Sequence, residues 1–202
     1  MKPGFPIALP GMRIGLLGGS FDPAHAGHLT ISRAALARIG IDRVWWLVSP
    51  GNPLKLRGPA PLEQRVSQAR NLVQDPRITV TDIEARLGLR LTADTLKALQ
   101  RLYPAVRFVW LMGSDNLVQF HKWDRWREIA ESVPIAVFAR PGSRLAARHS
   151  VAARVLSRAR LPEARIPLLA EMRPPAWVLL NVPMSDLSST ALRARPCGGG
   201  HI

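Results

Sequence analysis

Short apolar runs alternate with longer helical segments along most of this chain. The apolar runs cover residues 13–17, 44–48, 78–81, 106–112, 135–138 and 178–180, and the helical segments cover residues 29–39, 62–73, 92–102, 126–132, 145–158 and 189–195. Such alternation is typical of βαβ units, in which each helix returns the chain to a parallel strand. We therefore expect an α/β protein with a doubly wound, mostly parallel sheet and helices on both faces. Right-handed crossovers place the carboxyl ends of the strands along one edge, where such sheets bind ligands.

The chain has the length of one ordinary domain. Its 202 residues contain no repeat, linker or low-complexity segment that would mark a second unit. We predict one domain over residues 13–195, with loose termini at 1–12 and 196–202. A single cysteine, Cys197, excludes a disulfide framework and a cysteine zinc site. Because no apolar run reaches the roughly 18 residues of a membrane span and no secretory leader is evident, we expect a cytoplasmic protein.

The net charge of +14 favours anionic partners such as nucleotides or nucleic acid. Arginine carries most of this charge, since only four of the 28 basic residues are lysines. One group of arginines alternates with alanines rather than with aromatic residues that could stack on bases: Arg144, Arg148, Arg154, Arg158 and Arg160. This pattern favours a solvated surface, so we expect no nucleic-acid partner.

A glycine-rich motif, GGSFDPAHAGHL, joins the first apolar run to the first helical segment at residues 18–29. We expect its leading glycines to form a turn whose backbone N–H groups, with the helix start, favour anionic phosphate. His25 and His28 stand three residues apart, so both imidazoles can donate hydrogen bonds to a phosphate oxygen that gains charge in a transition state. Gly27 between them allows a substrate to approach closely. The motif lacks the Gly-Lys-Ser/Thr of a Walker A loop and the spacing of a dinucleotide fingerprint.

Two further blocks follow this motif along the chain, GSDN at residues 113–116 and LSSTALR at residues 187–193. Together the three blocks resemble those of the bacterial nicotinate-mononucleotide adenylyltransferases, whose signature is G-G-x-F-D-P-x-H-x-G-H-L. The resemblance runs from about residue 13 to residue 195. It implies a Rossmann-like fold of the H-x-G-H nucleotidyltransferase superfamily. It also implies adenylyl transfer from ATP to nicotinate mononucleotide, with release of pyrophosphate, in NAD biosynthesis.

The resemblance further implies which residues act on ATP. The catalytic roles fall to His25, His28, Lys55 and Arg193. The residues expected to bind ATP are Gly18, Gly19, Ser20, Phe21, Gly27, Gly113, Asp115, Ser188, Ser189 and Thr190. A helix cap is a second role open to Asp115 and to the hydroxyl run, although one serine would suffice for a cap. Mg²⁺ is expected to arrive with ATP, because no cluster of side chains offers a metal cage.

The same resemblance assigns the acceptor site. Nicotinate mononucleotide is expected to contact Asn52, Thr92, Trp123, Asp124 and Arg140. Trp123 would stack on the pyridine ring, and backbone N–H groups near Thr92 and Asp124 would take the nicotinate carboxylate. This chain has Arg90-Leu91 where the family more often has Ser-Tyr before the threonine. A structural ion pair is an equal alternative for Arg140.

Two other functions stay open from the sequence. Phosphopantetheine adenylyltransferase shares the fold and a related SST block, but it usually carries T-x-G-H and its chain is shorter. An arginine-rich nucleic-acid-binding protein would explain the charge, but that function leaves the three ordered blocks unexplained. The sequence does not determine the oligomeric state, and it is compatible with a homo-oligomer.

Overall fold

The computed structural model describes residues 4–51, 58–139 and 143–182. These residues form a six-stranded sheet in the order β3-β2-β1-β4-β5-β6, in which all neighbouring strands pair in parallel. The strands are β1 (Arg13–Gly19), β2 (Arg43–Val48), β3 (Ile78–Thr81), β4 (Arg107–Gly113), β5 (Ile135–Ala139) and β6 (Trp177–Asn181). This is the strand order of a doubly wound Rossmann-like sheet, so the expected fold class is confirmed.

Short and medium-length helices connect the strands. The α-helices are α1 (Ala26–Arg38), α2 (Leu62–Leu72), α3 (Ile83–Arg86), α4 (Thr92–Leu102), α5 (Ser114–Gln119), α6 (Trp126–Ser132), α7 (Arg144–Arg148) and α8 (Val151–Val155). The 3₁₀ helices are η1 (Phe120–Lys122), η2 (Ser157–Ala159) and η3 (Glu163–Glu171). Among the described residues, no helix is both long enough and apolar enough to cross a membrane.

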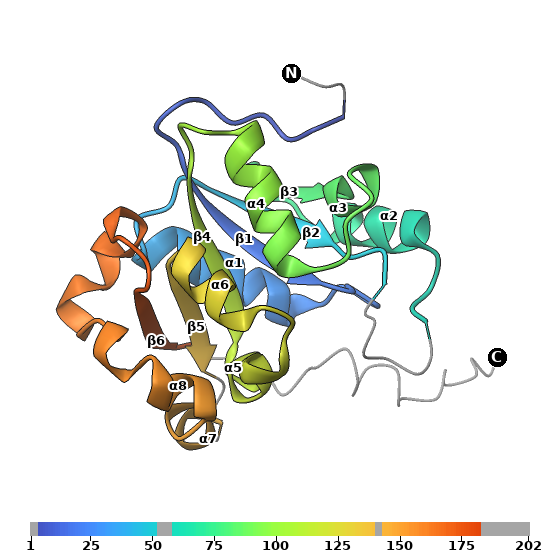
Figure 1. Ribbon diagram of the computed structural model, residues 1–202. Coiled ribbons are helices and arrows are strands. Elements are labelled where there is room, and N and C mark those ends of the chain that lie inside the picture. Colours follow the sequence, from blue (N-terminus) through green and yellow to red (C-terminus); the bar gives the residue numbers. More distant parts are fainter. Residues whose placement is uncertain (1–3, 52–57, 140–142, 183–202) are drawn as a thin grey trace.

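Two apolar cores lie on opposite faces of the sheet, because side chains alternate along each strand. In β1, Ile14 and Leu16 belong to one core, and Leu17 belongs to the other. Helices α3 to α8 cover the first core, whereas α1, α2 and η3 cover the second. Figure 1 shows α4 and α6 in front of the sheet and α1 behind it. Helices on both faces leave the edge formed by the strand ends as the place for a site.

Two boundaries near the glycine-rich motif differ from the sequence prediction. Gly18 and Gly19 end strand β1 rather than forming a turn, and the chain turns only after them. Helix α1 begins at Ala26 and not at residue 29, so His28 lies within its first turn. The helix start escaped prediction because His25 caps it, whereas the usual signal is Ser, Thr, Asp or Asn.

The helix predicted over residues 145–158 is interrupted. It divides into α7, α8 and η2, and Ser150 separates the first two. The Ser150 Oγ accepts a hydrogen bond from Ala153 N–H at 3.2 Å, so this buried serine caps α8 and ends the preceding helix. The helix predicted over residues 189–195 lies outside the described residues. The other predicted strands and helices are present, with ends that differ from the prediction by at most two residues.

The segment before β1 is attached to the domain over its described part. Tyr103 Oη donates a hydrogen bond to the carbonyl oxygen of Pro6 at 2.8 Å. Gly11 N–H donates to the carbonyl oxygen of Ala105 at 2.7 Å. Both contacts reach the loop that leads into β4, so this segment, expected to be loose, makes specific hydrogen bonds from Pro6 to Gly11.

Candidate active site

The candidate site lies at the carboxyl ends of β1 and β4, which are neighbours in the sheet. The chain proceeds from β1 outward to β2 and β3 on one side, and from β4 outward to β5 and β6 on the other (Figure 1). Open α/β sheets bind their ligands outside the strand ends at such a reversal of strand order. The H-x-G-H residues follow β1 and Asp115 follows β4, so two of the three sequence blocks lie at this edge.

His25 and His28 form a reciprocal cap at the start of α1. Gly27 N–H donates a hydrogen bond to His25 Nδ1 at 3.1 Å, and His25 N–H donates to His28 Nδ1 at 3.1 Å. The centroids of the two rings lie 4.0 Å apart. Histidines here take the places that Ser or Thr and Glu or Gln occupy in an ordinary capping box. The two side chains that the motif offers for chemistry therefore also build the helix start.

This cap fixes which ring nitrogen carries the proton. An Nδ1 atom that accepts a hydrogen bond carries no proton, so each neutral imidazole has its proton on Nε2. Each ring therefore has Nε2–H as its donor. The Nδ1 atoms of His25 and His28 serve the fold, and the Nε2–H groups are the ones suited to a phosphate oxygen.

The ring of Phe21 supports His28 from the side of the core. Phe21 is buried, stacks on Trp46 with centroids 5.0 Å apart, and lies 4.6 Å from the His28 ring. Trp46 Nε1 donates to Ser32 Oγ at 2.7 Å, and Ser32 Oγ donates to the His28 carbonyl oxygen at 2.8 Å. Strand β2 thus holds the first turn of α1 through side chains. The side chain of Phe21, an expected ATP contact, therefore packs in the core, and only its backbone is left for such a contact.

Arg65 of α2 joins the loops that follow β1 and β2. It is buried, and its guanidinium donates to the carbonyl oxygens of Ser20 at 2.6 Å and Ser49 at 2.8 Å. Its Nε donates to the carbonyl oxygen of Ala60 at 2.6 Å. Burial lowers the pKa of Arg65. The sequence motifs give no sign of this residue, yet it holds the backbone of Ser20, an expected ATP contact.

Two glycines at the strand ends have side chains packed close against their backbone. A Cβ at Gly18 would lie 2.6 Å from Cη2 of Trp110, so the indole packs directly against the strand backbone. The Trp110 ring also meets Trp123 edge-on, with centroids 6.3 Å apart. At Gly113 a Cβ would collide with Asp115 Oδ1. Gly113, and not Asp115, is the N-cap of α5. The Asp115 side chain is exposed, and its Oδ1 lies beside Gly113 at the end of β4.

The described acceptor residues gather around the start of α4. Thr92 is the first residue of this helix, and its N-cap, Leu91, makes no side-chain hydrogen bond. Within the described chain, the first amide of this turn to donate is Thr95 N–H, which bonds to the Leu91 carbonyl oxygen at 3.0 Å. An ion pair between Asp94 and Arg125, at 2.7 Å, joins the turn to the segment that follows Trp123. The structure therefore brings Thr92 close to the segment that holds Trp123 and Asp124.

A buried carboxyl group lies behind this turn. Glu84 of α3 is 6% exposed and accepts a hydrogen bond from Thr95 Oγ1 at 2.9 Å. Burial raises the pKa of Glu84 from an ordinary value of 4.5 to about 7, although the Thr95 hydrogen bond acts in the opposite direction. A raised pKa means that the folded state binds the proton more tightly than the unfolded state. The contribution to stability is therefore complete below about pH 4.5 and is lost as the pH rises through about 7.

We expect the free energy of unfolding to fall by up to about 3 kcal/mol between about pH 5 and about pH 8 through Glu84. Glu84→Gln removes this titration and keeps a hydrogen-bond acceptor, so its pH profile should be flatter than that of the wild type. Urea unfolding at a series of pH values measures the difference. Glu131→Gln changes an exposed glutamate of α6 and should follow the wild type. Equal slopes for wild type and Glu84→Gln would contradict this account of the buried carboxyl group.

Comparisons with known proteins agree with this geometry. A family model described as cytidylyltransferase-like matches residues 16–195. The chain is 64% identical over 183 residues to the probable nicotinate-nucleotide adenylyltransferase of Cereibacter sphaeroides, covering 91% of this chain and 97% of that protein. It is 58% identical over 194 residues to the protein of the same name from Ruegeria pomeroyi, covering 96% of this chain and 91% of that protein. The chain belongs to the nicotinate-nucleotide adenylyltransferase family.

The fold is similar to that of a solved protein structure. Plasmodium falciparum nicotinic acid mononucleotide adenylyltransferase, complexed with NaAD, matches with a TM-score of 0.66 over 90% of this chain and 82% of that chain. The two sequences are 19% identical, so this match concerns the fold alone. The family membership itself confirms the resemblance drawn from the three sequence blocks.

Seven of the expected site residues lie outside the described residues: Asn52, Lys55, Arg140, Ser188, Ser189, Thr190 and Arg193. Their roles rest on the resemblance to the nicotinate-nucleotide adenylyltransferase family. Within the described ranges, no three His, Cys, Asp or Glu side chains come close enough together to hold a metal ion. The sequence did not reveal the residues that hold the expected site residues in place: Ser32, Trp46 and Arg65 beside the glycine-rich motif, and Arg125 beside Trp123 and Asp124.

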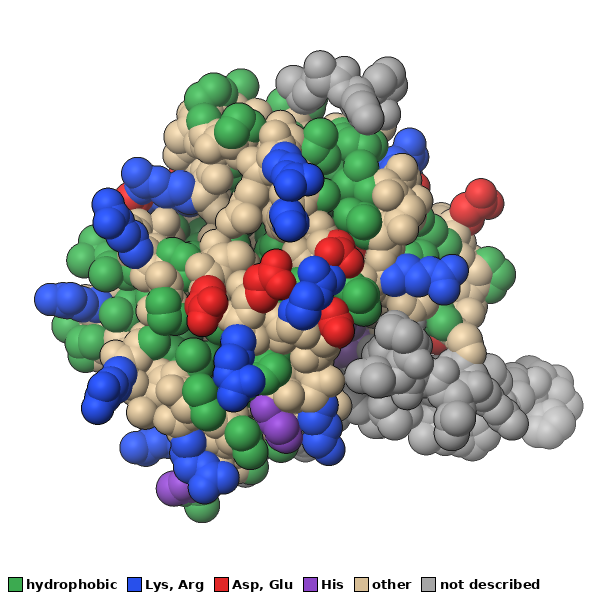
Figure 2. Space-filling view, in the orientation of Figure 1, with side chains coloured by type: hydrophobic (Ala, Val, Ile, Leu, Met, Phe, Trp, Pro, Cys, Tyr) green, Lys and Arg blue, Asp and Glu red, His purple; other side chains and the backbone are tan. Residues whose placement is uncertain are grey.

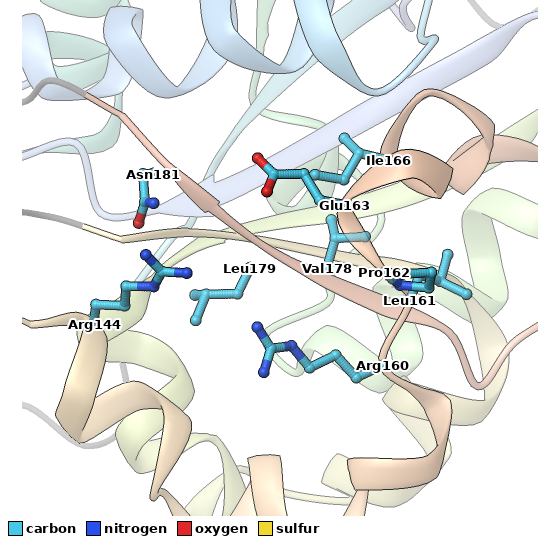
Figure 3. A pocket seen from close by; sticks show the side chains of 9 residues that line it. All are labelled: Arg144, Arg160, Leu161, Pro162, Glu163, Ile166, Val178, Leu179 and Asn181. Carbon is cyan, nitrogen blue, oxygen red and sulfur yellow. The ribbon is translucent and has the colours of Figure 1, made fainter.

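A cavity of about 280 Å³ lies away from this site, along the outer edge of β6. Figure 3 shows the side chains of Arg144 and Arg160 pointing toward Leu179 in this cavity. Burial, together with the nearby charges of Arg148 and Arg144, lowers the pKa of Arg160. Arg160 is half-buried over the Trp177 ring, whereas the other arginines of this region are exposed, as the sequence predicted. None of the lining residues belongs to the expected site of the family.

Proposed function

We propose that this protein transfers the adenylyl group of ATP to nicotinate mononucleotide, forming nicotinate adenine dinucleotide and pyrophosphate in NAD biosynthesis. The observation that carries the proposal is the histidine cap of α1, where His25 and His28 have two Nε2–H donors beside the reversal of strand order. Relatives that are more than half identical to this chain are named for this reaction. We place the reaction in the cytoplasm, where a chain with a single cysteine needs no disulfide framework.

The proposed reaction is a single in-line displacement. A phosphate oxygen of the mononucleotide attacks the α-phosphorus of ATP, and a new P–O bond forms. The bond from the α-phosphorus to the α–β bridging oxygen breaks, and its electron pair leaves with pyrophosphate. No side chain becomes covalently attached, so the protein contributes positioning and charge stabilisation.

Two pairs of basic side chains would bind the triphosphate. His25 and His28 would stabilise charge that develops on the α- and β-phosphate oxygens, and donors that are already oriented do so most effectively. By resemblance, Lys55 and Arg193 steady the triphosphate together with the hydroxyls of residues 188–190. Mg²⁺ bound to ATP would supply further neutralisation, with phosphate oxygens and water as its main ligands, because this ion gives up water reluctantly.

The start of α4 suits a carboxylate. The amides of residues 92–94 donate no hydrogen bond within the described chain, and a helix N-terminus favours an anion. Trp123 is half-buried, and its ring packs edge-on against Trp110 and Phe120. We therefore assign the nicotinate carboxylate to these amides and the pyridine ring to Trp123.

We expect kcat/KM to be roughly 5- to 150-fold higher for nicotinate mononucleotide than for nicotinamide mononucleotide, because the amide would leave buried donors unpaired at about 1–3 kcal/mol. Purified protein with ATP and Mg²⁺ is offered the two acceptors separately and in competition. Trp123→Ala should reduce the rate with both acceptors, because it removes the stacking ring. Equal values, or a preference for the amide, would contradict the carboxylate assignment. Adenylylation of phosphopantetheine alone would favour the alternative enzyme.

A further inference from the structure

Arg125 has a strained backbone directly beside the proposed acceptor pocket. It follows Trp123 and Asp124 and is the N-cap of α6. Its φ of 48° and ψ of 38° lie in the left-handed region, which residues other than glycine seldom adopt. Such a conformation persists where surrounding contacts hold it, and it is frequent at functional sites. The contacts of the Arg125 side chain supply that restraint.

The guanidinium of Arg125 forms ion pairs with three carboxylates. Arg125 Nη2 lies 2.7 Å from Asp94 Oδ1, and Arg125 Nε donates to Asp124 Oδ2 at 2.8 Å. Its Nη1 lies 3.8 Å from Glu128 Oε2. Figure 2 shows acidic side chains gathered around a basic one near the middle of this face. Because Asp94 belongs to the first turn of α4, the side chain bridges the two elements proposed to enclose the pyridine ring.

The first turn of α4 is itself held in place from behind. Thr95 Oγ1 donates to the buried Glu84 carboxyl group, and Thr95 N–H donates to the Leu91 carbonyl oxygen. Helices α4 and α6 also pack against each other. These contacts hold the first turn of α4 in place. The ion pair between Arg125 and Asp94 then connects the segment that carries Trp123 to this turn.

Arg125 also balances charge at the proposed carboxylate site. Asp94 and Asp124 bring two carboxylates close to the amides assigned to the nicotinate carboxylate, and like charges oppose one another. The Arg125 guanidinium lies within hydrogen-bond distance of both. Without its charge, an acid acceptor would meet uncompensated negative charge, whereas a neutral amide acceptor would not.

We propose that Arg125 is a positioning residue for the acceptor. It locks the turn at Trp123 onto the first turn of α4, and it neutralises Asp94 and Asp124 so that the pocket takes a carboxylate. The inference rests on the proposed function, and it gives Arg125 no contact with the reacting atoms. Substitution of Arg125 should therefore change the preference between acid and amide acceptors, because a loss of folding alone would affect both acceptors equally.

Arg125→Gln is the variant that tests this role. It should raise KM for nicotinate mononucleotide by roughly 3- to 10-fold, on the scale of an exposed ion-pair network. It should leave kcat and KM for ATP within about 2-fold of the wild type, and it should raise KM for nicotinamide mononucleotide less than KM for nicotinate mononucleotide, because the amide loses only the positioned ring. Arg125→Lys keeps the charge and loses the planar fork, so it should restore part of the acid preference. Adding Asp94→Asn to Arg125→Gln should also restore part of the preference for the acid acceptor, because the second substitution removes one uncompensated carboxylate.

Arg77→Gln is the matched control. Arg77 uses the same two nitrogens, here both on the single carboxylate of Asp75, with Nε at 3.0 Å and Nη2 at 2.8 Å, in an exposed turn at the amino end of β3. In Arg77→Gln, the KM values for nicotinate mononucleotide and for nicotinamide mononucleotide should both stay at the wild-type level. Suppose that the wild type adenylylates nicotinate mononucleotide. The inference is then overturned if Arg125→Gln leaves the ratio of the KM values for the acid and amide acceptors unchanged, whether neither value changes or both rise equally. Wild-type protein that adenylylates neither mononucleotide would overturn the proposed function and this inference with it.

Discussion

Replacing His28 with alanine should lower kcat by roughly 10²-fold or more, the scale for losing one preorganised donor. The KM for nicotinate mononucleotide should change little, because the lost interaction belongs to the transition state. The physical reason is the cap, in which Nδ1 accepts from His25 N–H, so that the proton that would be donated to phosphate is on Nε2. Steady-state kinetics with each substrate varied in turn measure the two constants.

Loss of the donor must be separated from loss of the cap. Alanine at position 28 removes a capping contact that contributes about 0.5–2 kcal/mol to stability. His28→Gln keeps a side chain that suits this position of a capping box, so the fold should survive while kcat stays low. His149→Ala changes an exposed histidine after α7 and should leave the rate near wild type. Turnover near wild type in both His28 variants would contradict the mechanism.

Arg193→Ala should weaken ATP binding by roughly 10- to 150-fold, because hydrogen bonds to charged groups contribute about 1.5–3 kcal/mol. The sequence places Arg193 four residues after Ser189, on one face of a predicted helix, where its planar fork suits two phosphate oxygens. Arg193→Lys should recover only part of the affinity, since lysine offers a point charge in place of the fork. Calorimetric titration with ATP measures the change.

The acceptor and the overall charge provide the controls for Arg193. The affinity for nicotinate mononucleotide should stay near that of the wild type in Arg193→Ala. Arg158→Ala removes an exposed arginine of η2 and lowers the net charge equally, so ATP affinity should hardly change. If ATP binds Arg193→Ala as tightly as the wild type and only the mononucleotide binds more weakly, the assignment to the triphosphate is wrong.

Local sequence patterns predicted the sheet well, because its strands are buried on both faces. A strand of a parallel sheet covered by helices reads as a continuous apolar run, as β2 and β4 do. Helix α4 was equally accessible to prediction, since its buried Ala93, Leu96 and Leu99 recur at helical spacing. The prediction of one continuous helix over residues 145–158 was wrong because of a single residue. Ser150 reads as an ordinary surface position in the sequence, and only its cap bond to Ala153 reveals the break.

The motif predicts where the site lies, but it does not show how the residues around it are held. Arg65 lies 45 residues from Ser20 in the sequence, and an arginine is ordinarily expected on the surface. The left-handed backbone of Arg125 is likewise invisible in the sequence, because composition favours glycine or asparagine for that conformation. Both residues act through contacts between segments that are distant in the sequence, and such contacts follow only from the tertiary fold.

Tracing the α-phosphate of ATP tests the central claim most directly. Wild-type protein is incubated with Mg²⁺, nicotinate mononucleotide and ATP labelled at the α-phosphate, and the products and the protein are separated. The label should enter nicotinate adenine dinucleotide, an equal amount of unlabelled pyrophosphate should be released, and the protein should carry no label. Label retained covalently on the protein would contradict the single displacement. The absence of a labelled dinucleotide from nicotinate mononucleotide would contradict the proposed reaction itself.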